Sequence, residues 1–324
     1  MKILFTVVIS LAAFFCFAQP KKMNVYFLKN SGTYVDKRDS ADFMRIVTEP
    51  DSGSKLYNVA EYYINGAKKL IGKSSKIDPP WFEGQRLEYY KKGTRKSVTN
   101  FKNGLQVGNQ YLFYPNGKAY LVKEYPDNGD RYNDIRNNYL IKAEYDSLGT
   151  LMFEGGNGYY KEYDDNFKAV IDEGPVKNGK RDGAWKGYNK GLKLNFAETY
   201  KDGELINGTA TDTVGKSTSY SKSRGTPPEF KGGVEAFGNY LGTHINYPTV
   251  ARENDQQGVV VLSFVVEKDG KITGVKVRKS VSKEIDEEAV RVIENSPRWV
   301  PGMQFGRPVR VSYSVPVNFA LTEQ

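Results

Sequence analysis

The chain is almost without two residue types that supply much enzyme and metal chemistry. Among its 324 residues there is a single cysteine, Cys16, and a single histidine, His244. Cys16 lies inside an N-terminal apolar run, so the rest of the chain offers no thiolate, no disulfide and no Cys/His metal site. A serine hydrolase with a histidine base could use only His244, which follows a helical pattern and is typical of a surface or packing residue. We therefore expect no enzyme, no metal and no cofactor.

Long apolar runs are also missing beyond the N-terminus. The chain begins with Lys2, an apolar run over residues 3–17, and small residues at Cys16 and Ala18, which is the layout of a signal peptide cut after Ala18. A lipoprotein would be modified at Cys16, but the bulky Phe15 stands where a small residue is expected. The run is shorter than the ~20 residues of a membrane span, and an uncleaved anchor is the alternative. In either case the protein is expected to leave the cytoplasm.

Basic residues are in excess, but they are not gathered. The net charge is +9, and all of this excess lies upstream of Glu229, because the residues from there to the C-terminus are balanced in charge. Lys and Arg stand singly or in pairs among Asp and Glu, whereas a nucleic-acid site needs them on one face. The sequence therefore predicts no nucleic-acid binding, and mixed charge of this kind favours solubility.

Aromatic residues are plentiful, with 23 Tyr and 17 Phe, and they favour β-sheets. Many belong to a repeated motif in which an aromatic residue and two spacers precede Gly. The copies are Tyr63–Gly66, Tyr90–Gly93, Phe101–Gly104, Tyr114–Gly117 and Tyr200–Gly203, with a degenerate copy at Val176–Gly179. An Asn-Gly pair can adopt positive φ at both centres of a tight hairpin turn, and the aromatic residue can close the hairpin by cross-strand packing. A row of antiparallel hairpins is predicted.

Two segments of this region, "NGLQVGNQYLFYPNG" and "NGKRDGAWKGY", resemble MORN-type repeats in the variant found in bacterial envelope proteins. The resemblance implies a scaffold or binding surface without catalytic residues, for residues 24–206. Exposed Tyr and Lys could contact glycan, lipid headgroups or protein; alternatively, the tyrosines are the core of a thin sheet. Residues 207–228 are rich in Gly, Ser and Thr, and they predict a flexible linker.

The last part of the chain, residues 229–324, has the pattern of a small α+β domain. Apolar spacing predicts a helix over residues 233–245, and Pro248 can open a short helix. Two β-rich runs flank a Lys-Asp-Gly turn that ends at Gly270, and Ser282 can cap a second long helix. The predicted fold is therefore mostly β, with antiparallel hairpin repeats followed by two helices over one face of a three-stranded antiparallel sheet.

The final predicted strand, Val309 to Val317, alternates almost without fault. Its apolar side consists of Val309, Val311, Tyr313, Val315 and Val317, and its other side of Arg310, Ser312, Ser314 and Pro316. One face is therefore suited to a core, and the other is left polar.

A set of residues spread through this domain forms a pattern: Tyr247-Pro248, Ala251, Gly258, Val260, Phe264, Val266, Asp269-Gly270, Ala289, Pro297, Trp299, Pro301-Gly302, Gly306, Pro308-Val309, Pro316 and Phe319. This pattern resembles the C-terminal domain of TonB, in the version of the Bacteroidetes-type energy transducers. The resemblance implies a periplasmic domain that captures the TonB box, an extended peptide of outer-membrane receptors, by strand addition at a sheet edge. The implied contact residues are Tyr247, Pro248, Val309, Arg310, Val311, Ser312, Tyr313, Ser314 and Val315. Trp299, Pro301 and Gly302 are interpreted as structural.

The chain also departs from the TonB pattern. TonB itself has a membrane-spanning helix that engages the ExbB–ExbD motor and a Pro-rich spacer, whereas here the N-terminal run is short and the 14 prolines form no rod. Two hypotheses follow. The first is a TonB-type transducer kept in the inner membrane of a Gram-negative bacterium by an uncleaved N-terminus. The second is a periplasmic adaptor in which repeats and C-terminal domain bind two partners. A homodimer through an exchanged edge strand is a further possibility.

Overall fold

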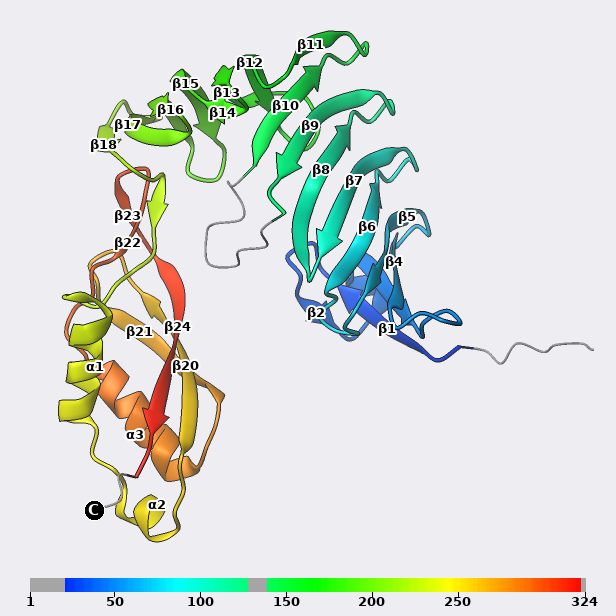
Figure 1. Cartoon of the computed structure of the whole chain (residues 1–324). Coiled ribbons are helices and arrows are strands. Elements are labelled where there is room, and N and C mark those ends of the chain that lie inside the picture. The colour runs from blue at the N-terminus through cyan, green and yellow to red at the C-terminus, as the bar shows by residue number, and fades with distance from the viewer. Residues whose placement is uncertain (1–20, 128–138, 322–324) are drawn as a thin grey trace, which may run out of the picture. The chain divides into compact units, whose positions relative to one another are not determined.

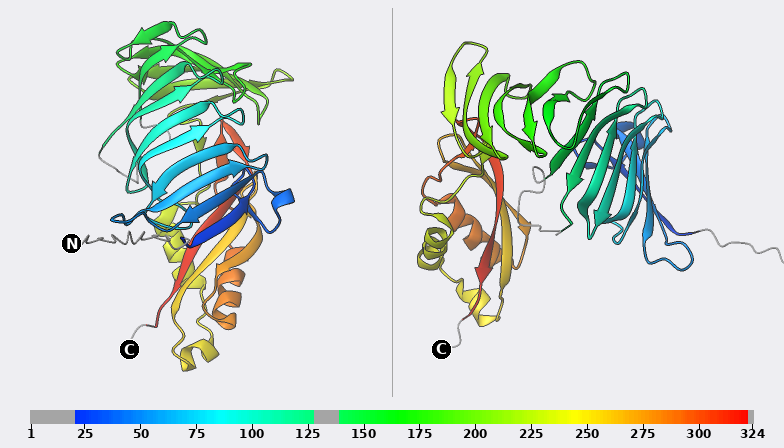
Figure 2. Two further views of the ribbon diagram at one scale, coloured as in Figure 1. Left: turned by 90° about the vertical axis from the view of Figure 1, so that its right-hand side faces the viewer. Right: turned by 45° about the horizontal axis from the view of Figure 1, so that its top comes forward.

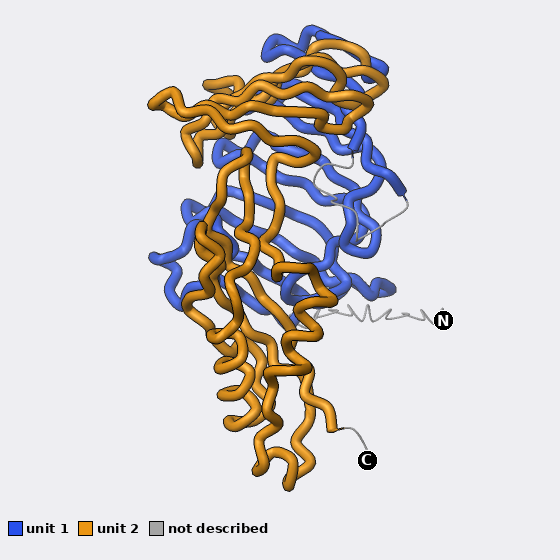
Figure 3. Tube along the Cα trace, turned by 90° about the vertical axis from the view of Figure 1, so that its left-hand side faces the viewer, with its two compact units in different colours: residues 1–156 blue, residues 157–324 orange. Residues whose placement is uncertain are grey.

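The computed structural model describes residues 21–127 and 139–321. Its contacts divide the chain into two units, residues 1–156 and 157–324, which Figure 3 shows in different colours. The predicted signal peptide or anchor, residues 1–18, lies outside the described residues. Within the described ranges, no helix is long and apolar enough to cross a membrane.

Unit 1 is built around an 11-stranded antiparallel sheet, and the mostly β prediction is confirmed (Figures 1 and 2). From β3 to β11 each strand pairs with the next strand in the sequence, as a row of hairpins requires. The elements are β1 (Met23–Leu28), β2 (Tyr34–Val35), a 3₁₀ turn η1 (Arg38–Ser40), β3 (Phe43–Thr48), β4 (Tyr57–Tyr63), β5 (Lys68–Ser74), β6 (Phe82–Tyr89), β7 (Arg95–Lys102), β8 (Leu105–Phe113), β9 (Ala119–Tyr125), β10 (Leu140–Tyr145) and β11 (Leu151–Glu154).

The hairpins are closed by turns of two kinds. At Asn103-Gly104 both residues have positive φ, 53° and 76°, as predicted for an Asn-Gly pair. The prediction is wrong for the turn of Tyr63–Gly66, where positive φ is confined to Gly66, at 86°. There the Gly66 N–H donates to the Tyr63 carbonyl and the Tyr63 N–H donates to the Ala67 carbonyl, both at 2.8 Å. This is a longer hairpin turn with glycine at the bulge, and the turns ending at Gly93 and Gly117 are built in the same way.

The tyrosines that begin these turns also link successive hairpins. The Tyr63 hydroxyl donates to the Tyr89 carbonyl at 3.0 Å, and the Tyr114 hydroxyl donates to the Tyr145 carbonyl at 2.9 Å. The Tyr90 hydroxyl does the same with the carbonyl of Phe113. Each ring is thus held by its own turn and by the next hairpin, which phenylalanine could not do. This agrees with the reading of the tyrosines as the core of a thin sheet.

Unit 2 begins with a seven-stranded antiparallel sheet of order β12-β13-β15-β16-β17-β18, with β14 beside β13. Aromatic rings lie over glycines of neighbouring strands. A Cβ added to Gly174 would lie 2.4 Å from Trp185, and one added to Gly208 would lie 2.5 Å from Tyr220. Glycine is therefore required there by packing. The strands are β12 (Gly158–Tyr163), β13 (Val170–Lys177), β14 (Lys180–Arg181), β15 (Gly183–Asn189), β16 (Leu194–Lys201), β17 (Glu204–Asp212) and β18 (Ser217–Tyr220).

The predicted flexible linker over residues 207–228 is wrong for most of its length. Its first part forms the end of β17 and all of β18, and the later β19 (Gly225–Thr226) pairs with a strand of the C-terminal domain. Ala210 is fully buried, and Tyr220 packs on the same cluster. Small residues here make room for aromatic rings from neighbouring strands, a role that composition alone does not reveal.

The C-terminal domain has the predicted α+β architecture. Its helices are α1 (Gly233–His244), α2 (Thr249–Glu253) and α3 (Lys283–Glu294), and its main strands are β20 (Gly258–Val266), β21 (Ile272–Lys279) and β24 (Val311–Phe319). The main sheet has the order β21-β20-β24, and its buried face and the helices form one core (Figure 1). Ser282 caps α3 as predicted, because its hydroxyl accepts a hydrogen bond from the Ile285 N–H at 3.5 Å. A second sheet has the order β19-β22-β23, with β22 (Gly302–Gln304) and β23 (Arg307–Val309).

Candidate functional site

The strand β24 forms one edge of the main C-terminal sheet. It pairs with β20 in an unbroken register that runs from Val266 opposite Val311 to Gly258 opposite Phe319. Among the residues that the structure describes, no strand pairs with the other side of β24. The outer backbone groups of β24 therefore form a row of donors and acceptors that is not paired with another described strand, which is the feature that strand addition needs.

The two faces of β24 differ as the sequence predicted. Val315, Val317 and Phe319 are buried in the core beneath the helices. Ser312 and Ser314 are exposed on the opposite face, as is Pro316. The core thus holds the strand in place while its polar face and outer edge remain accessible.

Pro316 indicates which backbone groups point outward. A proline is tolerated in a strand where its missing N–H faces away from the neighbouring strand. Pro316 lies opposite Val261 of β20, so its nitrogen is expected to face the outer edge. Because backbone direction alternates along a strand, the N–H groups of Ser312 and Ser314 face the same way. The stretch from Val311 to Val315 therefore has an intact row of outward groups, which Pro316 interrupts.

The opposite edge of this sheet, β21, is much less suited to a guest strand. Its register with β20 is broken twice, once between Val261 and Leu262 and once between Ser263 and Val265. It also carries exposed Lys276 and Lys279. Bulges and lysines are common ways in which proteins protect an edge against pairing. Only β24, of the two edges, combines a regular register with uncharged exposed side chains from Ser312 onward.

Two predicted contact residues lie away from this stretch. The Tyr247 ring packs edge-on against Phe319 at 5.8 Å between centroids, and its hydroxyl donates to the Gln256 carbonyl. Pro248 precedes α2 with φ of −61°. These residues therefore stand beside the C-terminal end of β24, whereas Ser312 and Ser314 lie nearer its beginning.

The predicted continuous strand from Val309 to Val317 is wrong at its start. Val309 ends β23 and pairs with Gly302 in the second sheet, and Arg310 lies between the two strands. The Arg310 side chain is exposed, and its Nε donates to both carboxylate oxygens of Glu267 at 3.0 and 3.1 Å. Hydrogen bonds from Thr273 and then from Arg310 lower the pKa of Glu267. Arg310 is therefore near the start of the open edge, but Val309 is not part of it.

Of the three residues interpreted as structural, Trp299 and Gly302 have packing contacts in the structure. Trp299 is 5% exposed, and its ring contacts Phe264 and Tyr313 with centroids 5.3 and 5.8 Å apart. Pro301, two residues further along the chain, is half-buried. A Cβ on Gly302 would lie 2.6 Å from the Val311 side chain, so this position requires glycine. Trp299 thus supports β24 from the core side.

Sequence reasoning missed the hairpin of β22 and β23, residues 302–309, which we call the docking hairpin. Its turn places Phe305 and Arg307 against the seven-stranded sheet, where Phe305 is 3% exposed. The available signal was Phe305 itself, which stands before Gly306 at a turn position where Asn or Asp is usual.

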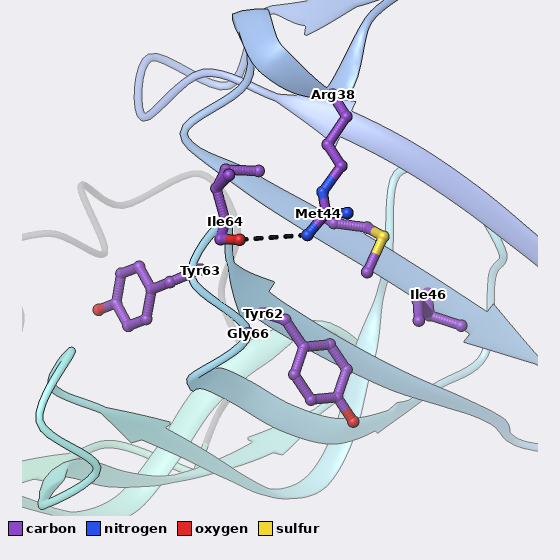
Figure 4. A pocket seen from close by; sticks show the side chains of 7 residues that line it. All are labelled: Arg38, Met44, Ile46, Tyr62, Tyr63, Ile64 and Gly66. Atoms are coloured by element: carbon purple, nitrogen blue, oxygen red, sulfur yellow. Dashed lines mark hydrogen bonds between the residues drawn. The ribbon is translucent and has the colours of Figure 1, made fainter.

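Compared with the edge of β24, a hollow in unit 1 offers few groups that could recognise a ligand (Figure 4). Its lining is Arg38, Met44, Ile46, Tyr62, Tyr63, Ile64 and Gly66. The one charged group, the Arg38 guanidinium, donates to the Ile64 carbonyl at 3.3 Å. The hollow therefore lacks the several convergent polar groups of a typical ligand site. Within the described ranges, no group of His, Cys, Asp and Glu side chains is arranged to hold a metal ion.

Comparison with known proteins gives a match in the C-terminal part of the chain. The family model of the Gram-negative bacterial TonB protein C-terminal matches residues 243–321. These residues form a TonB C-terminal domain. Two solution structures of the Helicobacter pylori TonB C-terminal domain are also similar: one at 21% identity over 28% of this chain and 82% of that chain, with a TM-score of 0.23, and a shorter one at 20% identity over 28% and 96%, with a TM-score of 0.22. No curated protein matches the chain.

The matched residues of the TonB C-terminal domain extend from the end of α1 to just beyond β24. They include the whole of the open edge and the docking hairpin. The sheets of residues 21–127 and 139–220 lie outside the match, so the MORN-like repeats remain a prediction from the sequence.

Proposed function

We propose that the outer edge of β24 binds an extended peptide by strand addition, and that this peptide is the TonB box of an outer-membrane receptor. The observation that carries the proposal is the uncovered, regular edge from Val311 to Val315, supported from below by the Trp299 core. Main-chain hydrogen bonds hold such a guest, and neighbouring side chains select it. Arg310, Ser312, Tyr313 and Ser314 are the proposed side-chain contacts, with Tyr247 and Pro248 at the far end of the strand.

This binding serves transport across the envelope of a Gram-negative bacterium, with the domain in the periplasm. No catalytic step is involved. Coupling to an ExbB–ExbD motor requires that the N-terminus remain in the membrane, whereas the adaptor hypothesis is compatible with a soluble or a membrane-associated protein. The mass of the mature protein separates the two, because a chain that begins at Gln19 has lost the apolar run.

The edge is tested by replacing Ser314 with Pro and, as the matched control, with Ala. Ser314→Pro deletes one outward donor and places a ring at the edge, whereas Ser314→Ala keeps the backbone unchanged. With about 1.5 kcal/mol for the lost hydrogen bond and clash, we expect roughly tenfold weaker binding for Pro and little change for Ala. The probes are synthetic peptides copied from the periplasmic ends of the host's outer-membrane receptors, titrated by calorimetry.

Equal affinities of the two variants, with both folded by circular dichroism, would contradict strand addition at β24. A homodimer made by pairing two β24 edges would compete with the peptide. In that case the wild-type affinity falls as the protein concentration rises, and sedimentation reports the dimer.

A further inference from the structure

The docking hairpin inserts an aromatic side chain into the seven-stranded sheet. Phe305 stacks on Phe196 with ring centroids 5.3 Å apart and meets Tyr220 edge-on at 5.5 Å. Leu194 and Ala210 complete the same buried cluster. All four partners belong to β16, β17 and β18, so the contact joins the C-terminal domain to the repeat region within unit 2.

The backbone conformation of Phe305 is unfavourable for phenylalanine, which indicates that its side chain is needed for a tertiary contact. Phe305 and Gly306 have φ of 50° and 72°, as in a two-residue turn with both centres in the left-handed region. Among the residues that the structure describes, three other turns with this geometry have Asn103, Asn178 or Asp202 at the first position, which are the residue types that tolerate it. A phenylalanine there is strained, and such strain persists only where the surroundings enforce it. Here the aromatic cluster on the sheet enforces this conformation.

Polar contacts fix the orientation of the hairpin. Arg307 forms an ion pair with Asp212 at 2.9 Å, donates to the Thr218 hydroxyl at 3.2 Å and donates to the Lys216 carbonyl at 2.6 Å. A Cβ on Gly306 would lie 2.5 Å from the carbonyl oxygen of Ser219, so the two backbones approach closely. Burial tends to raise the pKa of Asp212, but the hydrogen bonds from the Lys216 N–H and Arg307 outweigh it and lower this pKa.

The connecting segment adds a second tie beside the first. The Arg224 guanidinium pairs with Glu198, whose side chain is fully buried, and with Asp172 at 3.0 Å. The Phe305 N–H donates to the Arg224 carbonyl at 2.6 Å, and β19 pairs with β22. Hairpin and connecting segment therefore hold each other against the sheet.

We propose that the docking hairpin locks the C-terminal domain onto the seven-stranded sheet, so that the two move as one body. The lock lies directly beside β24, since β23 ends at Val309 and β24 begins at Val311. If β24 holds a guest peptide, as proposed above, a pull on that guest passes into the sheet through the hairpin as well as through the connecting segment. The lock itself does not depend on the guest.

The test uses the full chain with Cys16→Ala and two spin labels, at Lys186→Cys on the seven-stranded sheet and Lys283→Cys at the start of α3. Both side chains are exposed, and both residues lie in elements other than the hairpin, Lys186 in β15 and Lys283 at the start of α3. Phe305→Asn is the key substitution, because Asn suits the turn and cannot fill the aromatic cluster. Pro308→Ala, an exposed residue of the same hairpin, is the matched control. The readouts are the label–label distance distribution and the rate of proteolytic cleavage within residues 221–227.

We expect a single narrow distance in the wild type and in Pro308→Ala, and a broad distribution with at least tenfold faster cleavage in Phe305→Asn. A broad distribution in the wild type would overturn the lock, as would an unchanged narrow one in Phe305→Asn. If Phe305→Asn does not fold, Arg307→Gln is measured in its place with the same criteria. Peptide titration of Phe305→Asn is a separate measurement. Binding that is weaker in Ser314→Pro but unchanged in Phe305→Asn supports strand addition, whereas the lock is judged by the distances and the cleavage rate alone, so the failures of the two proposals are distinguishable.

Discussion

Removing the carboxylate of Glu198 is the severest test of how the seven-stranded sheet is held together. Its oxygens accept hydrogen bonds from the hydroxyls of Tyr220 and Tyr200, at 2.7 and 3.1 Å, and from Arg224 at 2.8 and 3.0 Å. The Glu198 side chain is fully buried, whereas that of Arg224 is 30% exposed. In Glu198→Leu the guanidinium and two hydroxyls lose their acceptor at once, although Asp172 still contacts Arg224.

The expected cost follows from the burial of this pair. Breaking a buried ion pair from one side destabilises a protein by about 3–5 kcal/mol, because the remaining charge is left without its partner. A domain has only about 5–15 kcal/mol of stability, so Glu198→Leu should remove a large part of it. Removing both members of the pair is less harmful than the sum of the two single changes. We expect a coupling of about 1–3 kcal/mol between Glu198→Leu and Arg224→Met.

The assay takes advantage of the position of the three tryptophans. Trp185 lies in β15 of the seven-stranded sheet, Trp299 lies in the C-terminal domain, and Trp81 immediately precedes β6 of the 11-stranded sheet. With Trp81→Phe and Trp299→Phe as background, fluorescence reports only on Trp185, which is 2% exposed. At about 2 kcal/mol per M, a loss of 4 kcal/mol moves the urea midpoint by about 2 M. A shift below about 0.5 M, or losses in the double variant that equal the sum of the single ones, would refute the role given to Glu198.

Two further perturbations test packing and titration. Gly270→Ala places a Cβ 2.0 Å from the carbonyl oxygen of Trp299, at a position where Gly270 has φ of 82°. We expect the variant to lose about 2 kcal/mol or more of stability in thermal unfolding. An unchanged midpoint would mean that this contact is loose. Burial, followed by the hydrogen bond to a carboxylate, raises the pKa of Tyr220. The stability from this shift is present below the unfolded pKa near 10 and is lost as the pH rises above it. Urea midpoints should therefore fall between about pH 9 and pH 11. Tyr220→Phe should reduce that fall.

Much of the C-terminal domain could be predicted from sequence because its determinants are local. The helix at α3 has its cap at Ser282, and the hairpin of β20 and β21 has Gly270 in its turn with φ of 82°. Apolar spacing identified the buried face of α3, whereas in α1 the same spacing included Val234, which is 88% exposed. The same reasoning identified the alternation of β24, which holds in the structure from Val311 to Val317.

The break at Arg310 could not be predicted from that alternation. Val309 and Val311 have the same parity, so a period of two continues through the point at which the strand changes its partner from Gly302 to Val266. Periodicity reports which face a side chain occupies, but it does not report which strand lies beside it. The hairpin between Gly302 and Val309 was therefore absorbed into a single long strand.

The docking hairpin could be recognised in another way, because the residue type of Phe305 disagrees with the backbone geometry of its turn. The turn at Phe305-Gly306 adopts the geometry that Asn103-Gly104 adopts elsewhere, but with a residue that this geometry disfavours. When a local choice contradicts the local geometry, the compensating interaction must come from tertiary contact. Here that contact is the stack on Phe196 with the Arg307 ion pair beside it. An aromatic residue before glycine in a tight turn is thus a reason to look for a partner surface elsewhere in the chain, before any fold is assigned to that surface.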